Sequence, residues 1–243
     1  DITAVVFYDK PLLKFARIIE TFLDYAPFGF GGFTQAFPLW VKDKVFHKRN
    51  IIIALSKCIG SSANLEKRIY FSEHHFSHAA SAFYPSPFKD AAVLTIDGVG
   101  EWATTSLATG KDNLLEIEKE LNFPHSIGLL YAAFTDYLGY KVNSGEYKVM
   151  GLAPYGEPRY LNLIKEYLID IAQDGSFKLN LEDFDYCTKG SMTNEKFNAL
   201  FGGLPRKPES ELSQRDMDIA ASIQMLTEEI IIKICTNISE TSK

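Results

Sequence analysis

Residues 91–108, AAVLTIDGVGEWATTSLA, decide the fold. Residues 91–96 form a short apolar run, which is typical of a buried strand. The glycines of Asp97-Gly98-Val99-Gly100 favour a tight turn, and residues 103–108 predict a returning strand. A third β-rich run follows at residues 114–121. The stretch therefore predicts three consecutive strands that pair as neighbours.

Helical and β patterns continue on both sides of this unit. Upstream, we expect strands at residues 2–8 and 68–72, helices at 12–25 and 73–84, and a packed Gly/Phe-rich loop at 27–38. Downstream, we expect helices at residues 126–138 and 145–152, a strand at 177–180, a loop at 202–208 and a terminal helix after the capping-box-like Ser213-Gln-Arg-Asp216. The order predicts a mixed α/β domain with a meander-type sheet and flanking helices.

Composition excludes several classes of protein. The 243 residues include 31 acidic and 25 basic side chains, giving a net charge of -6. With 46% apolar and 13% aromatic residues, the chain can bury a core in one or two domains, and disorder is disfavoured. The acidic balance disfavours nucleic acid as a partner, because phosphate binding needs clustered Lys and Arg. The basic cluster at residues 42–49 is better explained as a solvated helix face.

The cysteines and the lengths of the apolar runs predict a cytoplasmic location. Cys58, Cys187 and Cys235 are odd in number and form no CxxC pair, so neither a disulfide framework nor a structural zinc site is indicated. The longest apolar runs fall far short of the roughly 18–20 residues of a membrane span. The chain begins in a strand without Met and stops on a long amphipathic helix, so we expect it to be part of a larger protein.

Three histidines lie within Glu73-His-His-Phe-Ser-His78. If Ser72 caps a helix here, His74 and His78 at i and i+4 project from one face and could share a metal. His75 and His78 at i and i+3 are also neighbours, so spacing alone does not select the pair. The alternative is a set of ordinary, partly buried histidines. We favour a metal bound by two imidazoles and a carboxylate, a ligand set that suits Fe, Zn or Mn.

Three further segments carry polar groups that suit anion binding. The Asp97–Gly100 turn could surround a phosphate or acyl oxygen with backbone N–H groups, or be a simple hairpin with glycines at positive φ. Ser144, Glu146 and Lys148 cluster at a predicted helix start, where the helix N-terminus and a lysine could hold an anion together. A solvated Glu146/Lys148 pair is the alternative. His125, just before another helix, is either a substrate contact or a capping neighbour.

Four motifs together resemble one family. EHHFSHAASAFYPSPF at 73–88, LTIDGVGEWATTS at 94–106, FPHSIGLLYAAFTDYLGY at 123–140 and NSGEYKVMGLAPYG at 143–156 are similar to the O-carbamoyltransferases of nodulation and antibiotic tailoring. The resemblance covers essentially the whole chain. It implies an α/β fold of the actin-like ATPase superfamily, built on ribonuclease-H-like units and related to the domain that transfers threonylcarbamoyl to tRNA.

The resemblance also implies a chemistry. In such enzymes a separate C-terminal domain converts carbamoyl phosphate and ATP to carbamoyl adenylate, and the metal-containing N-terminal domain passes the carbamoyl group to a hydroxyl of a sugar or antibiotic. Carried over by position, His74, His78 and Asp97 are the metal ligands. The HxxxH element of the related tRNA-modifying domain supports the i, i+4 pair, His74 and His78, over His75. A second set is expected to contact the substrate: Gly98, Gly100, His125, Glu146 and Lys148.

Some parts of the family pattern are missing here. The HD-containing turn and EERF-type segment of the first phosphate-binding strand, a downstream metal-binding Asp and the adenylate-forming domain are not in the sequence. We therefore expect residues 1–243 to be a partial metal-binding domain, inactive alone, that works with the C-terminal domain of its own polypeptide. A homodimer is left open. Two alternatives remain: a non-catalytic nucleotide-binding or oligomerisation module of the actin-like fold, and threonylcarbamoyl transfer to tRNA, which GEYKVMGLAPYG and the acidic balance disfavour.

Overall fold

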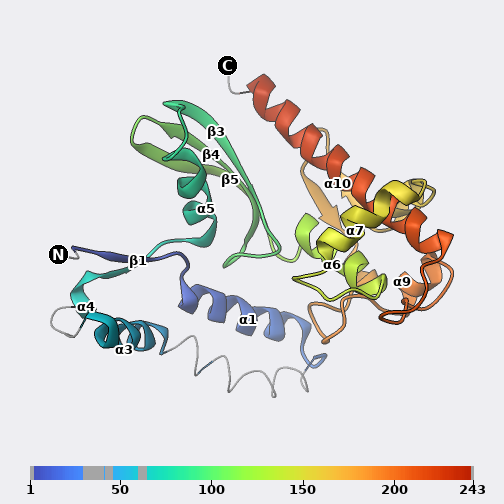
Figure 1. Ribbon diagram of the computed structural model, residues 1–243, viewed down its shortest axis with the longest axis horizontal. Helices are drawn as coiled ribbons and strands as arrows, with labels where there is room; N and C mark the ends of the chain where they lie inside the picture. The colour runs from blue at the N-terminus through green and yellow to red at the C-terminus, as the bar shows by residue number, and fades with distance from the viewer. Residues whose placement is uncertain (1–2, 30–40, 42–45, 60–64, 242–243) are drawn as a thin grey trace. The chain divides into compact units, whose positions relative to one another are not determined.

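The computed structural model describes residues 3–29, 41, 46–59 and 65–241 (Figure 1). They fall into two compact units, one of Asp1–Thr95 with Gly100–Lys119 and one of Ile96–Val99 with Glu120–Lys243. Most of the loop predicted at 27–38, and part of the basic cluster at 42–49, lie outside the described residues.

The first unit opens with a parallel strand pair. β1 (Val5–Phe7) pairs with β2 (Ile69–Phe71) in the register Val5↔Ile69 and Phe7↔Phe71. Helices α1 (Pro11–Tyr25), α3 (His47–Ile59) and α4 (Leu65–Arg68) lie between the two strands in sequence. Pro11 occupies the first position of α1, where its missing N–H costs no intrahelical bond. The predicted strands and the helix at 12–25 are confirmed.

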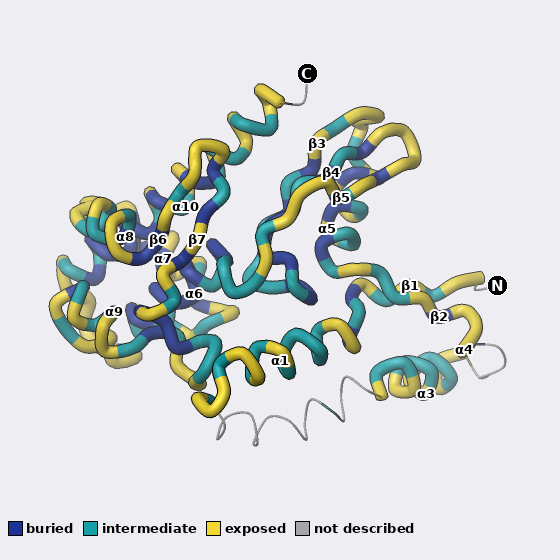
Figure 2. The backbone as a smooth tube through the Cα atoms, turned by 180° about the vertical axis from the view of Figure 1, so that it is seen from behind, coloured by how far each residue is buried: buried dark blue, intermediate teal, exposed yellow. Residues whose placement is uncertain are grey.

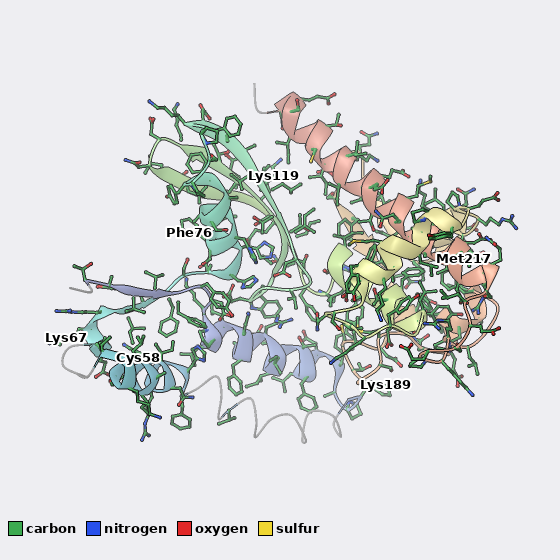
Figure 3. The ribbon with its side chains drawn as sticks, viewed as in Figure 1. Cys58, Lys67, Phe76, Lys119, Lys189 and Met217 are labelled. Atoms are coloured by element: carbon green, nitrogen blue, oxygen red, sulfur yellow. The ribbon has the colours of Figure 1, made fainter. Side chains whose placement is uncertain are left out.

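The predicted meander is also confirmed. β3 (Asp90–Ile96), β4 (Ala103–Lys111) and β5 (Leu114–Asn122) form one sheet in the order β3-β4-β5. Their connections, residues 97–102 and 112–113, are too short for parallel crossovers, so neighbouring strands run antiparallel. Helix α5 (His74–Phe83) packs on this sheet. Their shared core consists of Ala79, Phe83, Val93, Ala108 and Leu115, with the partly buried ring of Phe76 against it (Figure 3).

The second unit is mainly helical. Its helices are α6 (Ile127–Tyr137), α7 (Glu146–Leu152), α8 (Leu161–Tyr167), α9 (Glu195–Leu200) and α10 (Gln214–Thr241), with short 3-10 turns η2 (Ala153–Tyr155) and η3 (Leu181–Asp183). β6 (Ile169–Ile171) and β7 (Phe177–Leu179) form an antiparallel pair. The described strands therefore form three separate sheets, where the pattern predicted one meander and gave no sign of β6.

The core of the second unit surrounds α6, most of which is buried (Figure 2). Phe197 is fully buried, and its ring lies 5.1 Å from those of Phe134 and Tyr137 and 4.7 Å from that of Phe201. Helix α10 closes this core with Ile219, Ile223, Leu226 and Ile230.

Helix α10 begins where its capping box predicts. Oδ2 of Asp216 accepts hydrogen bonds from the N–H (2.9 Å) and the hydroxyl (2.7 Å) of Ser213. Its buried residues run from Asp216 to Ile230, and within the described chain residues 231–241 add none. In the described part of the chain, no helix combines the length and apolarity needed to span a membrane.

Candidate metal centre

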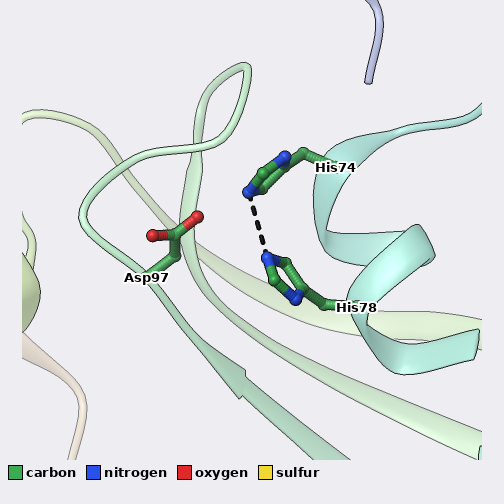
Figure 4. A group of neighbouring side chains, drawn as sticks. All are labelled: His74, His78 and Asp97. Carbon is green, nitrogen blue, oxygen red and sulfur yellow. Dashed lines mark hydrogen bonds between the residues drawn. The ribbon is translucent and has the colours of Figure 1, made fainter. Parts of the chain in front are cut away.

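His74 and His78 come together on one face of α5. Their Nε2 atoms are 3.1 Å apart, and both rings point toward the hairpin turn after β3 (Figure 4). Two nitrogens that each lie about 2.0–2.1 Å from one ion, at tetrahedral or octahedral angles, are about 2.9–3.4 Å apart. The observed spacing therefore fits a shared metal ion.

Asp97 supplies the third group. Asp97 directly follows β3, at the start of the connection to β4. Its side chain lies beside the two histidines of α5 (Figure 4). One ligand atom from each of His74, His78 and Asp97 lies within 4.8 Å of the others. His78 is exposed, while the other two are half-buried. Two imidazoles and a carboxylate with one exposed side suit a divalent ion that must also reach a substrate.

His75 belongs to the core instead. It is 2% exposed, and its Nδ1 lies 2.9 Å from Oγ of Ser106, which is also buried. His75, Ala79 and Phe83 are the buried residues of α5, spaced four residues apart on the face that packs on the sheet. The alternative of an ordinary buried histidine therefore describes His75. A sequence signal for this was present, because positions 79 and 83 are apolar.

Glu101 is the residue that sequence reasoning missed. It is 7% exposed, and its carboxylate accepts hydrogen bonds from the backbone N–H of His74 (3.0 Å to Oε2) and of Lys10 (2.7 Å to Oε1). The expectation that Ser72 caps α5 is wrong. Glu73 occupies the N-cap position, and within the described chain its side chain makes no capping bond. The carboxylate of Glu101, 27 residues away in sequence, bonds the first helical N–H instead.

The backbone N–H groups of Gly98 and Gly100 bond acceptors within the hairpin turn. The N–H of Gly100 donates to the carbonyl of Ala103 (2.9 Å), and that of Gly98 to Oδ1 of Asp97 (2.6 Å). Neither glycine adopts the positive φ that the simple-hairpin alternative assumed. A Cβ on Gly100 would lie 3.0 Å from the ring of His75 and 3.2 Å from Cβ of His74. Gly100 therefore permits the close approach of the hairpin to α5.

In the second unit, the start of α6 holds the Asp97–Gly98 backbone. The hydroxyl of Ser126, the N-cap of α6, lies 2.7 Å from the carbonyl of Gly98 and 3.1 Å from that of Asp97, to which it donates. The same oxygen accepts the N–H of Leu129. A Cβ on Gly128 would lie only 2.6 Å from the Asp97 carbonyl oxygen. Helix start and turn are therefore in direct backbone contact.

His125 is oriented by a strand of the second unit. Its Nδ1 accepts the N–H of Leu179 at 3.1 Å. Burial, and to a smaller extent the charge of Lys178, lower the pKa of His125 from its ordinary value of 6.5. The imidazole is therefore neutral near pH 7, and its remaining proton is on Nε2.

The polar groups predicted to cluster at the start of α7, Ser144, Glu146 and Lys148, interact with residues close to them in sequence. Glu146 accepts the N–H groups of Asn143 (2.8 Å) and Gly145 (3.1 Å), and so caps its own helix. The ammonium of Lys148 lies 5.6 Å from the ring centroid of Tyr140. Both lysines of this region, Lys141 and Lys148, line a cavity of about 480 Å³. The hydroxyl of Ser144 bonds the carbonyl of Lys141 at 3.4 Å.

Known proteins similar to this chain point to one family. The family model for the carbamoyltransferase N-terminus matches residues 1–243. An uncharacterized protein of Synechocystis sp. is 52% identical over 240 residues, which are 99% of this chain and 39% of that protein. Nodulation protein NolNO of Sinorhizobium fredii is 35% identical over 175 residues, 71% of this chain and 24% of that protein. Nodulation protein NolO of Bradyrhizobium diazoefficiens is 33% identical over 161 residues, 65% of this chain and 27% of that protein. The chain thus spans well under half the length of each relative.

Proposed function

Because the chain belongs to the carbamoyltransferase N-terminus family, we propose that it carries the transfer site of a carbamoyltransferase. The donor is carbamoyl adenylate, made from carbamoyl phosphate and ATP by a C-terminal domain of the same polypeptide. The acceptor is a hydroxyl of a sugar or an antibiotic-like small molecule. The observation that carries the proposal is the pair of Nε2 atoms of His74 and His78, 3.1 Å apart, beside Asp97.

The ligand set indicates what the site does. His74, His78 and Asp97 would hold the divalent ion, with Fe, Zn and Mn as the candidates. Such an ion supplies positive charge that lowers the pKa of a hydroxyl and polarises the donor carbonyl. His78 is exposed, which supports access of the acceptor from that side.

The remaining residues are proposed to bind and orient the donor. Lys148 would offset the charge of the adenylate phosphate, since its ammonium lies beside a cavity rather than in a core. His125 would donate a hydrogen bond from Nε2, because Nδ1 is already an acceptor. We propose the actin-like fold because the motifs resemble those of the O-carbamoyltransferase family. We propose a cytoplasmic location because all three cysteines are free thiols.

Substitution of the histidines in the full-length enzyme tests this function. His74→Ala and His78→Ala should lose bound metal and carbamoyl transfer, while carbamoyl adenylate formation continues at the rate of the unmodified enzyme. His75→Ala should keep the metal but melt at lower temperature, because it leaves the buried hydroxyl of Ser106 without its partner. Ser81→Ala, on the same helix, is the matched control. Unchanged metal content in His74→Ala and His78→Ala would overturn the proposal.

A further inference from the structure

We propose that Glu101 is a positioning residue for the metal centre, and that its carboxylate fixes His74 by capping two helices at once. The inference rests on the proposed metal site. Glu101 is not among the three residues whose ligand atoms group at the site. It acts through the backbone of the helix that carries both imidazoles.

The start of α5 depends on this distant carboxylate. A helix leaves its first N–H groups without intrahelical partners, and a side chain just before the helix usually accepts them. Among the described residues no local side chain does so at α5. Oε2 and Oε1 of Glu101 lie 3.0 Å and 3.3 Å from the N–H of His74, and its negative charge faces the positive end of the helix dipole.

The same carboxylate binds the start of α1. Oε1 accepts the N–H of Lys10, the N-cap residue of α1, at 2.7 Å. Within the described chain the side chain of Lys10 makes no capping bond of its own, and its ammonium pairs instead with the exposed Glu73 at 2.6 Å. One buried carboxylate therefore joins the ends of two helices to the loop after β3.

We call the bonds from Glu101 to the starts of α5 and α1 the Glu101 clamp, and its effect on the metal centre follows from the position of Glu101 in the sequence. Glu101 lies on the same short connection between β3 and β4 as Asp97. A carboxylate that bonds the N–H of His74 thus fixes the spacing between the segment that supplies the oxygen ligand and the helix that supplies the nitrogens. Groups that hydrogen-bond metal-ligating side chains typically change metal affinity by about 10–100-fold when replaced, and we expect a change of this order for a carboxylate that holds the backbone of His74.

Metal titration of the full-length protein tests the clamp. Glu101→Gln keeps the size of the side chain but turns an NH2 group toward one of two backbone donors. Stripped of metal and titrated with Co²⁺ alone, this variant should bind about 10–100-fold more weakly than the unmodified protein. The visible absorption bands of bound Co²⁺ should shift, because Asp97 is no longer held at one spacing from the imidazoles of α5.

Two control variants separate positioning from general destabilisation. Glu73→Gln makes the same charge change at the exposed N-cap of α5, and its Co²⁺ affinity should stay within about twofold. Ser213→Ala removes a cap from α10 in the other unit, and should lower stability without changing Co²⁺ affinity.

The outcomes for the two proposals differ. If His74→Ala and His78→Ala lose the metal while Glu101→Gln binds Co²⁺ with unchanged affinity and spectrum, the clamp is refuted and the metal site stands. If His74→Ala and His78→Ala bind as the unmodified protein does, the metal site itself is refuted, and the clamp with it.

Discussion

Replacing Gly128 by alanine should destabilise the protein, although alanine is the better helix former. Gly128 lies in the first turn of α6. Its added Cβ would lie 2.6 Å from the carbonyl oxygen of Asp97 and 2.8 Å from the nitrogen of Gly98. Both atoms belong to the backbone, so no side chain can rotate away. The helix start must therefore move off the turn, and the bonds from Ser126 to the two carbonyls weaken with it.

The size of the effect follows from three contributions. Alanine gains up to about 1 kcal/mol in helix propensity. Overpacking against rigid backbone costs about 1–3 kcal/mol. Loss of the Ser126 hydroxyl bonding costs about 0.5–1.5 kcal/mol more. With the full gain of about 1 kcal/mol subtracted, the net loss for Gly128→Ala is about 0.5–3.5 kcal/mol of unfolding free energy.

Gly151→Ala is the matched control. Gly151 lies in α7 of the same unit, and no described atom lies within 4 Å of the Cβ it would gain. This variant should be stabilised by up to about 1 kcal/mol. Equilibrium urea unfolding followed by far-ultraviolet circular dichroism measures both. A Gly128→Ala midpoint equal to or above that of the unmodified protein would refute the reasoning about the turn.

Two further predictions concern the second unit. Phe197→Ala should lower the free energy of unfolding by about 3–5 kcal/mol, because it empties the centre of the aromatic core. Ile232→Ala, at a side chain that is 64% exposed, should change it by under about 0.5 kcal/mol, and equal urea midpoints for the two variants would contradict this. The pKa of His125 is lower in the folded protein than its ordinary 6.5, so the unfolded chain takes up this proton first as pH falls, and stability is lost below about pH 6.5. His125→Asn, which keeps an acceptor for the N–H of Leu179, should show a smaller drop in urea midpoint between pH 7.5 and 5.5, and parallel pH profiles would refute the assignment.

Local patterns predicted the elements that lie around the site. The apolar run of β3 with its glycine turn, the helical spacing of α5 and the capping box at Ser213 are each set by residues close in sequence, and all three are confirmed. β6 was missed because its three residues follow α8 after a single residue, so no separate β pattern marks them.

The parts of the site that sequence could not predict depend on tertiary contacts. Helical spacing places both His74 and His75 within reach of His78, and only the packing of α5 on the sheet turns His75 inward to Ser106. The cap on α5 comes from Glu101, across 27 residues, so no window of local sequence contains both partners. Ser72 was the best local candidate, and a buried carboxylate from the hairpin took its place.

The distribution of buried side chains along α10 implies a gradient of local unfolding. Buried side chains hold the helix as far as Ile230, and the partly buried Ile234 also packs against the core, while residues 235–241 rely on the continuity of the helix itself. Helical segments of that length are marginal in water by themselves. Amide hydrogen exchange should therefore be slow before Ile230 and accelerate turn by turn toward Thr241, as opening of each later turn requires less free energy. The exchange profile of the unmodified protein would locate the last turn that the core holds in place.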